Sequence, residues 1–266
     1  MVMPRLQVIG GGRMGEALVA GLLAGGWAPA GDLRVVERLP DRAAELRERF
    51  AGLAVGDEPE AAQGHVVAVK PGDVDGVCRA LASVGSEAPV LSIAAGVTLD
   101  RLEGALAPGT PVVRAMPNTP ALVGAGAAAV APGSAAGDDE LAWAEGILGA
   151  VGKVVRVAEP LLDAVTGLSG SGPAYVFLVA EALIDAGVLA GLPRPVAVTL
   201  TRQTLLGAGR LLDESGEGPE ALRAAVTSPG GTTAAGLRVL EAAGVRAALL
   251  DAVTAAAQRS RELGAG

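Results

Sequence analysis

Near its start the chain carries the stretch Val8-Ile9-Gly10-Gly11-Gly12-Arg13-Met14-Gly15, a glycine-rich turn that directly follows an apolar run. The run at 6–9 predicts a strand, and the apolar-rich stretch at 16–23 predicts a helix. In that setting the pattern G-x-G-x-x-G is typical of dinucleotide binding, because a pyrophosphate can lie on backbone N–H groups at the helix N-terminus. Glycine is frequent here, at 39 of 266 residues, so the flanking strand and helix favour this interpretation over an ordinary βα turn.

Composition narrows the classes of partner. The net charge is −8, which argues against nucleic acid, because phosphate binding needs clustered Lys and Arg. The single cysteine, Cys78, cannot form an internal disulfide, as is usual in a reducing cytoplasm. With only one histidine and one cysteine, we expect no metal site.

We also expect a soluble, cytoplasmic chain with no membrane segment. Its N-terminus leads straight into a predicted strand, without the basic and apolar regions of a signal peptide. The stretch 115–137 holds no charged residue, but Pro117, Pro120 and several glycines would interrupt a membrane-spanning helix.

The first part of the chain alternates predicted strands with predicted helices. Strands are expected at 33–36, 65–69, 89–93, 111–114 and 154–157. Helices are expected near 41–50, 74–84, 99–105 and 138–151. This alternation predicts a mostly parallel sheet with right-handed crossovers, the architecture of a Rossmann domain.

The last hundred or so residues lack strand patterns. Helices are predicted at 173–190, 193–214, 219–226 and 233–263, the last broken near Gly244. We therefore expect an α/β domain at 1–159 and an all-α domain at 160–266. The helix at 173–190 is apolar on nearly every face, which favours burial against a second subunit over a compact monomeric bundle.

Short loops follow three of the predicted strands. They contain Lys70-Pro71, Ala94-Ala95-Gly96, and Asn118 within Met116-Pro117-Asn118-Thr119-Pro120. Ligands of open parallel sheets bind at the carboxyl ends of the strands, so these loops are candidate cofactor contacts as well as plain βα connections.

The helical part holds a second candidate anion site, Thr227-Ser228-Pro229-Gly230-Gly231-Thr232-Thr233, just before a helix. Free N–H groups, hydroxyls and the positive end of a helix dipole suit a carboxylate. An ordinary helix N-cap after a glycine turn is the alternative.

The chain is poor in residues that could protonate an alkoxide. His65 heads a predicted strand, Tyr175 begins the apolar helix, and Lys153 lies near the expected domain boundary. A dehydrogenase of this kind suits a substrate that accepts a hydride without a strong protein acid. A protonated imine meets that requirement.

These motifs together resemble pyrroline-5-carboxylate reductase over essentially the whole length. The resemblance is carried by the glycine turn at 10–15, by Ala68-Val69-Lys70-Pro71, by Ser92-Ile93-Ala94-Ala95-Gly96-Val97-Thr98, by Arg114-Ala115-Met116-Pro117-Asn118-Thr119-Pro120, by Gly167-Leu168-Ser169-Gly170-Ser171-Gly172-Pro173-Ala174-Tyr175 and by Val226-Thr227-Ser228-Pro229-Gly230-Gly231-Thr232-Thr233.

The resemblance implies hydride transfer from NAD(P)H to 1-pyrroline-5-carboxylate, giving L-proline, in a homodimer or a ring of dimers. It implies that Thr233 acts as the catalytic residue, with its hydroxyl on the ring nitrogen. The substrate residues it implies are Asn118, Ser228, Gly230, Gly231, Thr232 and Thr233. The cofactor residues are Gly10, Gly11, Gly12, Arg13, Met14, Gly15, Glu37, Arg38, Val69, Lys70, Pro71, Ala94, Ala95 and Gly96. Relatives often carry an amide side chain three positions before Ser228, which reaches the cofactor of the neighbouring subunit; this chain has Ala225 there, so the resemblance does not carry that contact over.

Residues after the second predicted strand give opposing indications for NADH and for NADPH. Glu37 lies 37 − 15 = 22 residues after Gly15, where an acidic group binds a ribose 2′-hydroxyl and favours NADH. Arg38 and Arg42 could instead bind a 2′-phosphate. With the habit of the family, we expect NADPH, with NADH as the alternative.

Two other functions share this architecture. A β-hydroxyacid dehydrogenase would need a lysine acid in the helical domain, and no lysine follows Lys153. A non-catalytic nucleotide sensor would leave the stretch at 227–233 without a task.

Overall fold

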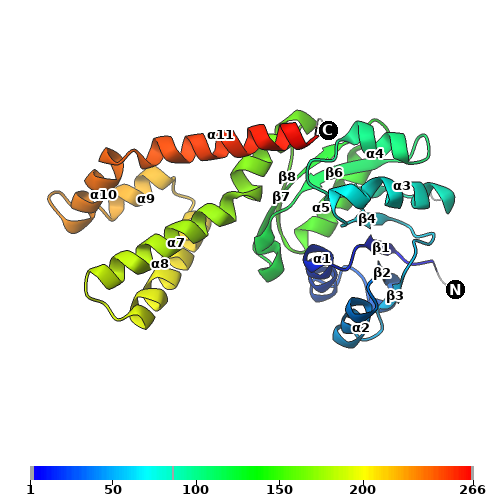
Figure 1. Ribbon diagram of the computed structural model, residues 1–266, viewed down its shortest axis with the longest axis horizontal. Coiled ribbons are helices and arrows are strands. Elements are labelled where there is room, and N and C mark those ends of the chain that lie inside the picture. The colour runs from blue at the N-terminus through cyan, green and yellow to red at the C-terminus, as the bar shows by residue number, and fades with distance from the viewer. Residues whose placement is uncertain (1–2, 86, 265–266) are drawn as a thin grey trace. The chain divides into compact units, whose positions relative to one another are not determined.

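The computed structural model describes residues 3–85 and 87–264, in two compact units. The larger unit comprises Met1–Ser171 together with Thr254–Gly266, and the smaller comprises Gly172–Val253. Figure 1 shows the elements of both units.

The larger unit is built on one eight-stranded sheet with the order β3-β2-β1-β4-β5-β6-β7-β8. The strands are β1 (Leu6–Ile9), β2 (Leu33–Val36), β3 (Ala54–Gly56), β4 (His65–Val67), β5 (Val90–Ser92), β6 (Val112–Met116), β7 (Gly126–Pro132) and β8 (Gly152–Arg156). All neighbours pair in parallel except β6 and β7. The order reverses between β1 and β4, which makes a switch point where ligands of such sheets bind.

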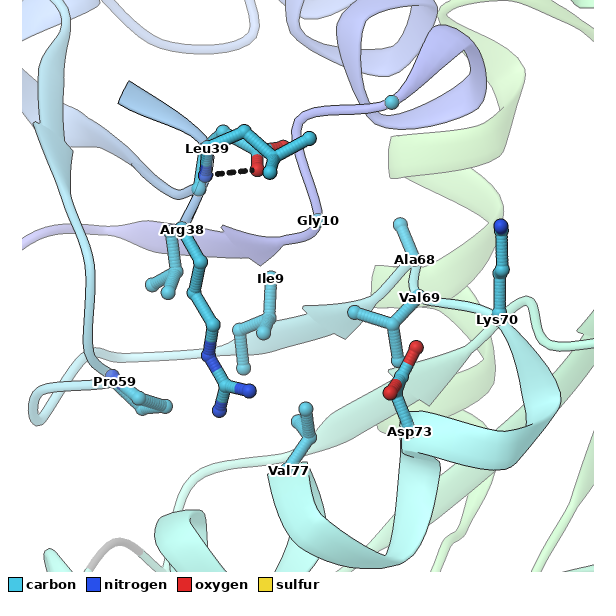
Figure 2. A pocket seen from close by; sticks show the side chains of 13 residues that line it. Ile9, Gly10, Arg38, Leu39, Pro59, Ala68, Val69, Lys70, Asp73 and Val77 are labelled. Atoms are coloured by element: carbon cyan, nitrogen blue, oxygen red, sulfur yellow. Dashed lines mark hydrogen bonds between the residues drawn. The ribbon is translucent and has the colours of Figure 1, made fainter. Parts of the chain in front are cut away.

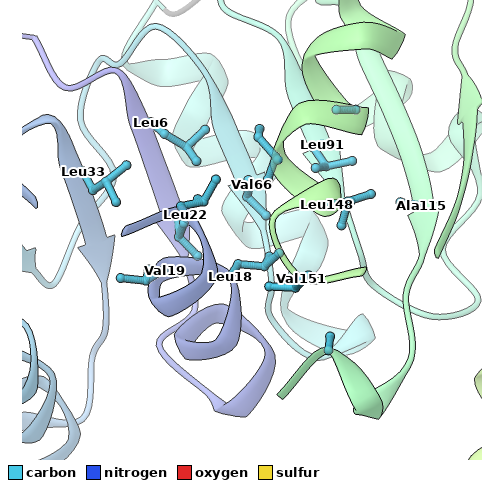
Figure 3. Close-up of a cluster of buried hydrophobic side chains, with 14 of the residues drawn as sticks. Leu6, Leu18, Val19, Leu22, Leu33, Val66, Leu91, Ala115, Leu148 and Val151 are labelled. Carbon is cyan, nitrogen blue, oxygen red and sulfur yellow. The ribbon is translucent and has the colours of Figure 1, made fainter. Parts of the chain in front are cut away.

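Helices cover both faces of this sheet. They are α1 (Arg13–Ala24), α2 (Pro40–Arg49), α3 (Val74–Ser83), α4 (Leu99–Ala105), α5 (Asp138–Gly149) and the short α6 (Leu162–Val165). Alternate strand residues supply two cores, because successive side chains point to opposite faces. Val8 and Val66 join Leu18 of α1 and Ile147 of α5 in one core (Figure 3). Their neighbours along the strands pack on the other face, against α3 and α4.

The predicted α/β class is confirmed, and the differences lie mainly in short or small-residue strands. The sequence patterns missed β3 and β7. Strand β7 contains Ala127, Ala128, Ala129, Val130 and Ala131, whose small side chains carry little hydrophobic signal. It is a sheet strand within the uncharged stretch at 115–137. The third predicted strand ends at Val67, two residues before its expected end.

The smaller unit consists of helices and their connections, as expected of an all-α region. Its helices are α7 (Gly172–Leu189), α8 (Arg194–Glu214), α9 (Pro219–Ala225), α10 (Thr232–Ala242) and the first part of α11 (Val245–Gly264). Helices α7 and α8 form a hairpin in which Gly187 lies close to Ala197. The far end of α11 belongs to the larger unit, where Ser260 Oγ donates a hydrogen bond of 2.6 Å to Asp163.

Helix α7 exposes its apolar side chains in the single chain. None of its residues is buried, and the side chain of Leu189 is 91% exposed. By length and composition alone, the segment Glu159–Leu189 could also cross a membrane. In the whole smaller unit, Ala197 and Thr201 are the buried residues. This unit therefore lacks a hydrophobic core of its own.

The one histidine is a buried structural group at the start of β4. His65 Nδ1 lies 3.1 Å from Nε2 of Gln7, which also donates to the carbonyl of Glu60. Burial disfavours the imidazolium and lowers the pKa of His65 from 6.5 to about 4. The imidazole is therefore neutral in the folded chain at any pH near neutrality.

We expect this burial to make the protein acid-sensitive. Between pH 6.5 and 4, His65 takes up a proton in the unfolded chain but not in the folded one, so the free energy of unfolding falls on acidification. The contribution reaches about 3 kcal/mol, the equivalent of the pKa difference. Urea unfolding at fixed protein concentration, compared between pH 7.5 and 4.5, measures it. The variant His65→Asn keeps an acceptor for Gln7 but cannot titrate, so its profile should be shallower; parallel profiles would contradict the assignment.

Candidate active site

The glycine-rich turn is shaped by two close backbone approaches. Gly10 has a φ of 108°, and a Cβ there would lie 2.5 Å from the carbonyl oxygen of Ala68. A Cβ on Gly15 would overlap the carbonyl oxygen of Gly10. At Gly10 both the positive φ and the lack of space exclude a side chain, whereas at Gly15, inside α1, the lack of space alone excludes one. The turn therefore brings the start of α1 directly to the end of β1.

The third glycine of the turn faces open space. Gly12 precedes α1 with a φ of −65°, no side chain caps the helix there, and a Cβ would meet no atom within 4 Å. The first N–H groups of a helix lack intrahelical partners and attract anions. This opening borders a cavity of about 350 Å³. The site therefore fits a pyrophosphate.

The cavity follows the carboxyl edge of the sheet (Figure 2). Of the residues predicted to bind the cofactor, it is lined by Gly10, Gly12, Glu37, Arg38, Val69 and Lys70. The lining does not include Gly11, Arg13, Met14, Gly15, Pro71, Ala94, Ala95 or Gly96. Pro71 begins a short 3-10 turn after β4, and Ala94 is buried after β5.

Sequence reasoning missed several lining residues, most of them apolar. The cavity also contacts Ile9, Val36, Leu39, Pro59, Ala68 and Val77, together with the acidic Asp73. Ile9 and Val36 end their strands, so their position at the carboxyl edge was available as a signal. Pro59 lies in the loop after β3, which the patterns did not predict.

Asn118 is held by the larger unit itself. Its Nδ2 donates to the carbonyl of Ser169 at 3.0 Å, and its Oδ1 accepts from the N–H of Ala127 at 2.8 Å. The amide thus joins the loop after β6 to the π-helical turn Thr166–Gly170 and to β7. Contact with substrate through this side chain would need those bonds to be exchanged, and it stays a prediction.

The second predicted anion site lies at the start of α10 in the smaller unit. Gly231 precedes the helix without a side-chain cap, and Gly230 has a φ of 70°. Ser228 folds over the turn, since a Cβ on Gly231 would overlap its Oγ. The N–H of Gly231 donates to the carbonyl of Ser228 at 3.0 Å. The hydroxyl of Ser228 and the uncapped end of α10 therefore lie close together.

Comparison with known proteins adds to this geometry. Residues 159–263 match the family model described as pyrroline-5-carboxylate reductase dimerisation, and residues 5–96 match one described as NADP oxidoreductase coenzyme F420-dependent. A pyrroline-5-carboxylate reductase of Synechocystis is 48% identical over 263 residues, with 98% of each chain covered. The chain belongs to the pyrroline-5-carboxylate reductase family.

Solved structures of the family agree with this assignment. The reductase of Coxiella burnetii superposes with a TM-score of 0.92 at 38% identity, covering 98% of this chain and 99% of the other. The pyrroline carboxylate reductase of Plasmodium falciparum, solved with NADP bound, gives 0.82 at 28% identity, covering 99% and 100%.

The family establishes the reaction. The protein is an oxidoreductase that uses NAD(P)H to reduce 1-pyrroline-5-carboxylate to proline, as the sequence predicted. The β-hydroxyacid dehydrogenase and the nucleotide sensor are set aside by this full-length match. The segment that matches the dimerisation model includes α7, whose apolar side chains are exposed in the single chain.

The open position of Gly12 yields a prediction about cofactor binding. We expect Gly12→Val to place its side chain in the cavity and to weaken NADPH binding at least about tenfold, because the pyrophosphate and the side chain compete for one space. The melting temperature should change by no more than about 3 °C, since a Cβ at Gly12 meets nothing. Fluorescence titration and thermal unfolding measure the two effects. Gly104→Val, at an equally open exposed position in α4, is the control and should bind NADPH normally; normal binding by Gly12→Val would place the pyrophosphate elsewhere.

Proposed function

We propose that the two uncapped helix ends hold the two anionic reactants. The cofactor pyrophosphate lies at Gly12 and the start of α1, and the substrate carboxylate lies at Gly231 and the start of α10. The observation that carries this proposal is that each end lacks a side-chain cap and follows a glycine turn. An anion gains from both the free N–H groups and the helix dipole.

The remaining site residues follow from the same placement. Cofactor contacts come from Gly10, Gly11, Gly12, Arg13, Met14, Gly15, Arg38, Val69, Lys70, Pro71, Ala94, Ala95 and Gly96, and Glu37 borders the same cavity. Substrate contacts come from Ser228, Gly230, Gly231, Thr232 and Thr233, with Asn118 at the loop after β6. Five of the cofactor residues line the cavity, which supports their assignment.

The chain contributes positioning and electrostatics to the reaction. When bound, the cofactor supplies a hydride to the carbon of the C=N bond, and the electron pair of that bond moves to the ring nitrogen. The nitrogen of the protonated imine already carries its proton, so no protein acid is needed at this step. Ser228 and the N–H groups near Gly231 and Thr232, at the start of α10, orient the carboxylate, and the Thr233 hydroxyl orients the ring nitrogen.

We propose a cytoplasmic homodimer, or a ring of such dimers, with domains at 1–159 and 160–266. The dimerisation match beginning at residue 159 supports this division. The smaller unit, with Ala197 and Thr201 as its buried residues, supports an association that completes its core. The net charge of −8 disfavours nucleic acid, and the dimer gives α7 a protein partner in place of a membrane.

A direct assay tests the reaction. We expect purified protein to consume NADPH in the presence of racemic 1-pyrroline-5-carboxylate and to form L-proline, followed by absorbance and by amino-acid analysis. A hydroxyacid substrate with NADP should give no turnover. Absence of imine turnover at micromolar enzyme would overturn the function.

The role of Thr233 is tested by separating catalysis from cofactor binding. We expect Thr233→Ala to lower kcat about 10- to 100-fold, the value of a hydrogen bond to a charged group. The Kd for NADPH should stay within about twofold, because the proposed cofactor site is at the start of α1 and not at α10. Thr233→Ser restores the hydroxyl and should recover most of kcat. Equal losses of kcat and NADPH affinity would mean that the hydroxyl does not act at the reacting ring.

A further inference from the structure

Three charged side chains cluster after β2, where a dinucleotide-binding sheet meets the adenosine ribose: Glu37, Arg38 and Arg42. They differ in what they already bind. Their partners show which of them is free to read the 2′ position of the ribose, and therefore which form of the cofactor the cavity selects.

Glu37 is committed to the backbone. Its Oε2 accepts a hydrogen bond from the N–H of Gly11 at 3.1 Å, and its Oε1 accepts one from the N–H of Leu39 at 2.9 Å. Figure 2 shows the second of these bonds. Each carboxylate oxygen thus holds one peptide, and the side chain joins the glycine turn to the start of α2. A ribose hydroxyl would have to compete with these bonds.

Arg42 is committed as well. Its Nε donates to the carbonyl of Gly11 at 2.8 Å, while its terminal nitrogens pair with Glu16 and Glu45. The peptide groups of Gly11 are therefore held from both sides, by Glu37 at the N–H and by Arg42 at the carbonyl. The space around Gly11 is also filled, since a Cβ there would lie 3.0 Å from Oε2 of Glu37.

Arg38 remains available. It is exposed and forms no hydrogen bond or ion pair with the residues that the structure describes. Figure 2 shows its guanidinium extended into the cavity between Pro59 and Val77, with Lys70 on the other side. A guanidinium presents several N–H donors in a planar fork that matches phosphate.

We propose that Arg38 selects the 2′-phosphorylated cofactor, and that Glu37 is a positioning residue for Gly11 instead of a ribose ligand. This inference rests on the proposed placement of the cofactor and deepens it. It also reverses the usual interpretation of an acidic residue at this position. The carboxylate accepts hydrogen bonds from the N–H groups of Gly11 and Leu39. The acidic residue that would otherwise favour NADH is therefore already hydrogen-bonded to the backbone.

The first test uses two small nucleotides instead of turnover. Calorimetric titration of the purified protein with adenosine 2′,5′-bisphosphate and with 5′-AMP isolates the contribution of the 2′-phosphate. We expect the wild type to prefer the bisphosphate, and Arg38→Ala to weaken its binding about 10- to 100-fold while leaving 5′-AMP within about twofold. Arg79→Ala removes another exposed arginine, from α3, and should change neither affinity. A preference unchanged in Arg38→Ala would overturn the proposal.

The second test distinguishes positioning from ribose contact. Glu37→Gln keeps one acceptor and loses the other, so as a positioning variant it should weaken both nucleotides equally, by about 2- to 10-fold, and lower the melting temperature. If the carboxylate instead faced the ribose, neutralising it would strengthen binding of the bisphosphate and change the ratio of the two affinities. An altered ratio would therefore contradict the role assigned to Glu37.

These outcomes are separable from those of the function itself. If the protein prefers the bisphosphate but does not reduce the imine, the proposed placement of the substrate is wrong and the role of Arg38 still stands. If it reduces the imine but binds both nucleotides equally well, the reaction stands and the role proposed for Arg38 is wrong.

Discussion

The larger unit depends on the contact between the peptide of Gly10 and its two neighbours, Ala68 at the end of β4 and Gly15 in the first turn of α1. Because no side chain intervenes, the helix starts directly at the strand end, and its free N–H groups border the cavity. The two cores on either face of the sheet then hold α1 and α3 in place around that edge. Packing and ligand geometry thus share one constraint, and a side chain at either glycine would disturb both.

Charged side chains hold the backbone around this contact. Glu37 accepts from the N–H of Gly11, Arg42 donates to its carbonyl, and Arg42 also pairs with Glu16 on α1. Charged hydrogen bonds to backbone groups are stronger than neutral ones, so they suit a turn that must be rigid before the ligand arrives. The same bonds decide which charges face the ligand. Glu37 and Arg42 bind groups of the protein, whereas Arg38 lines the cavity (Figure 2).

Sequence patterns predicted the class of the fold and most of its elements. Helix α4 was predicted at its observed bounds, and the break near Gly244 separates α10 from α11 as expected. Strand β7 was missed because alanine-rich strands carry little apolar contrast, and because its pairing with β6 is set by distant residues. The hydrogen-bond partners of individual side chains could not be predicted either. No sequence rule shows that Glu37 accepts from the N–H of Gly11, or that both Nδ2 and Oδ1 of Asn118 are hydrogen-bonded.

The smaller unit buries too little apolar surface to offset the entropy cost of folding by itself. An apolar side chain gains about 1.5–3 kcal/mol when it leaves water, and ordering each backbone residue costs about 1–2 kcal/mol. In Gly172–Val253, Ala197 and Thr201 are buried, while Phe177 and Leu178 of α7 are more than half exposed. A single copy therefore offsets little of the ordering cost of these helices. Association through the dimerisation region would bury those side chains, so folding of this unit and subunit assembly should be one thermodynamic event. The proposed substrate site at the start of α10 belongs to the same unit, so we expect its geometry to depend on that association.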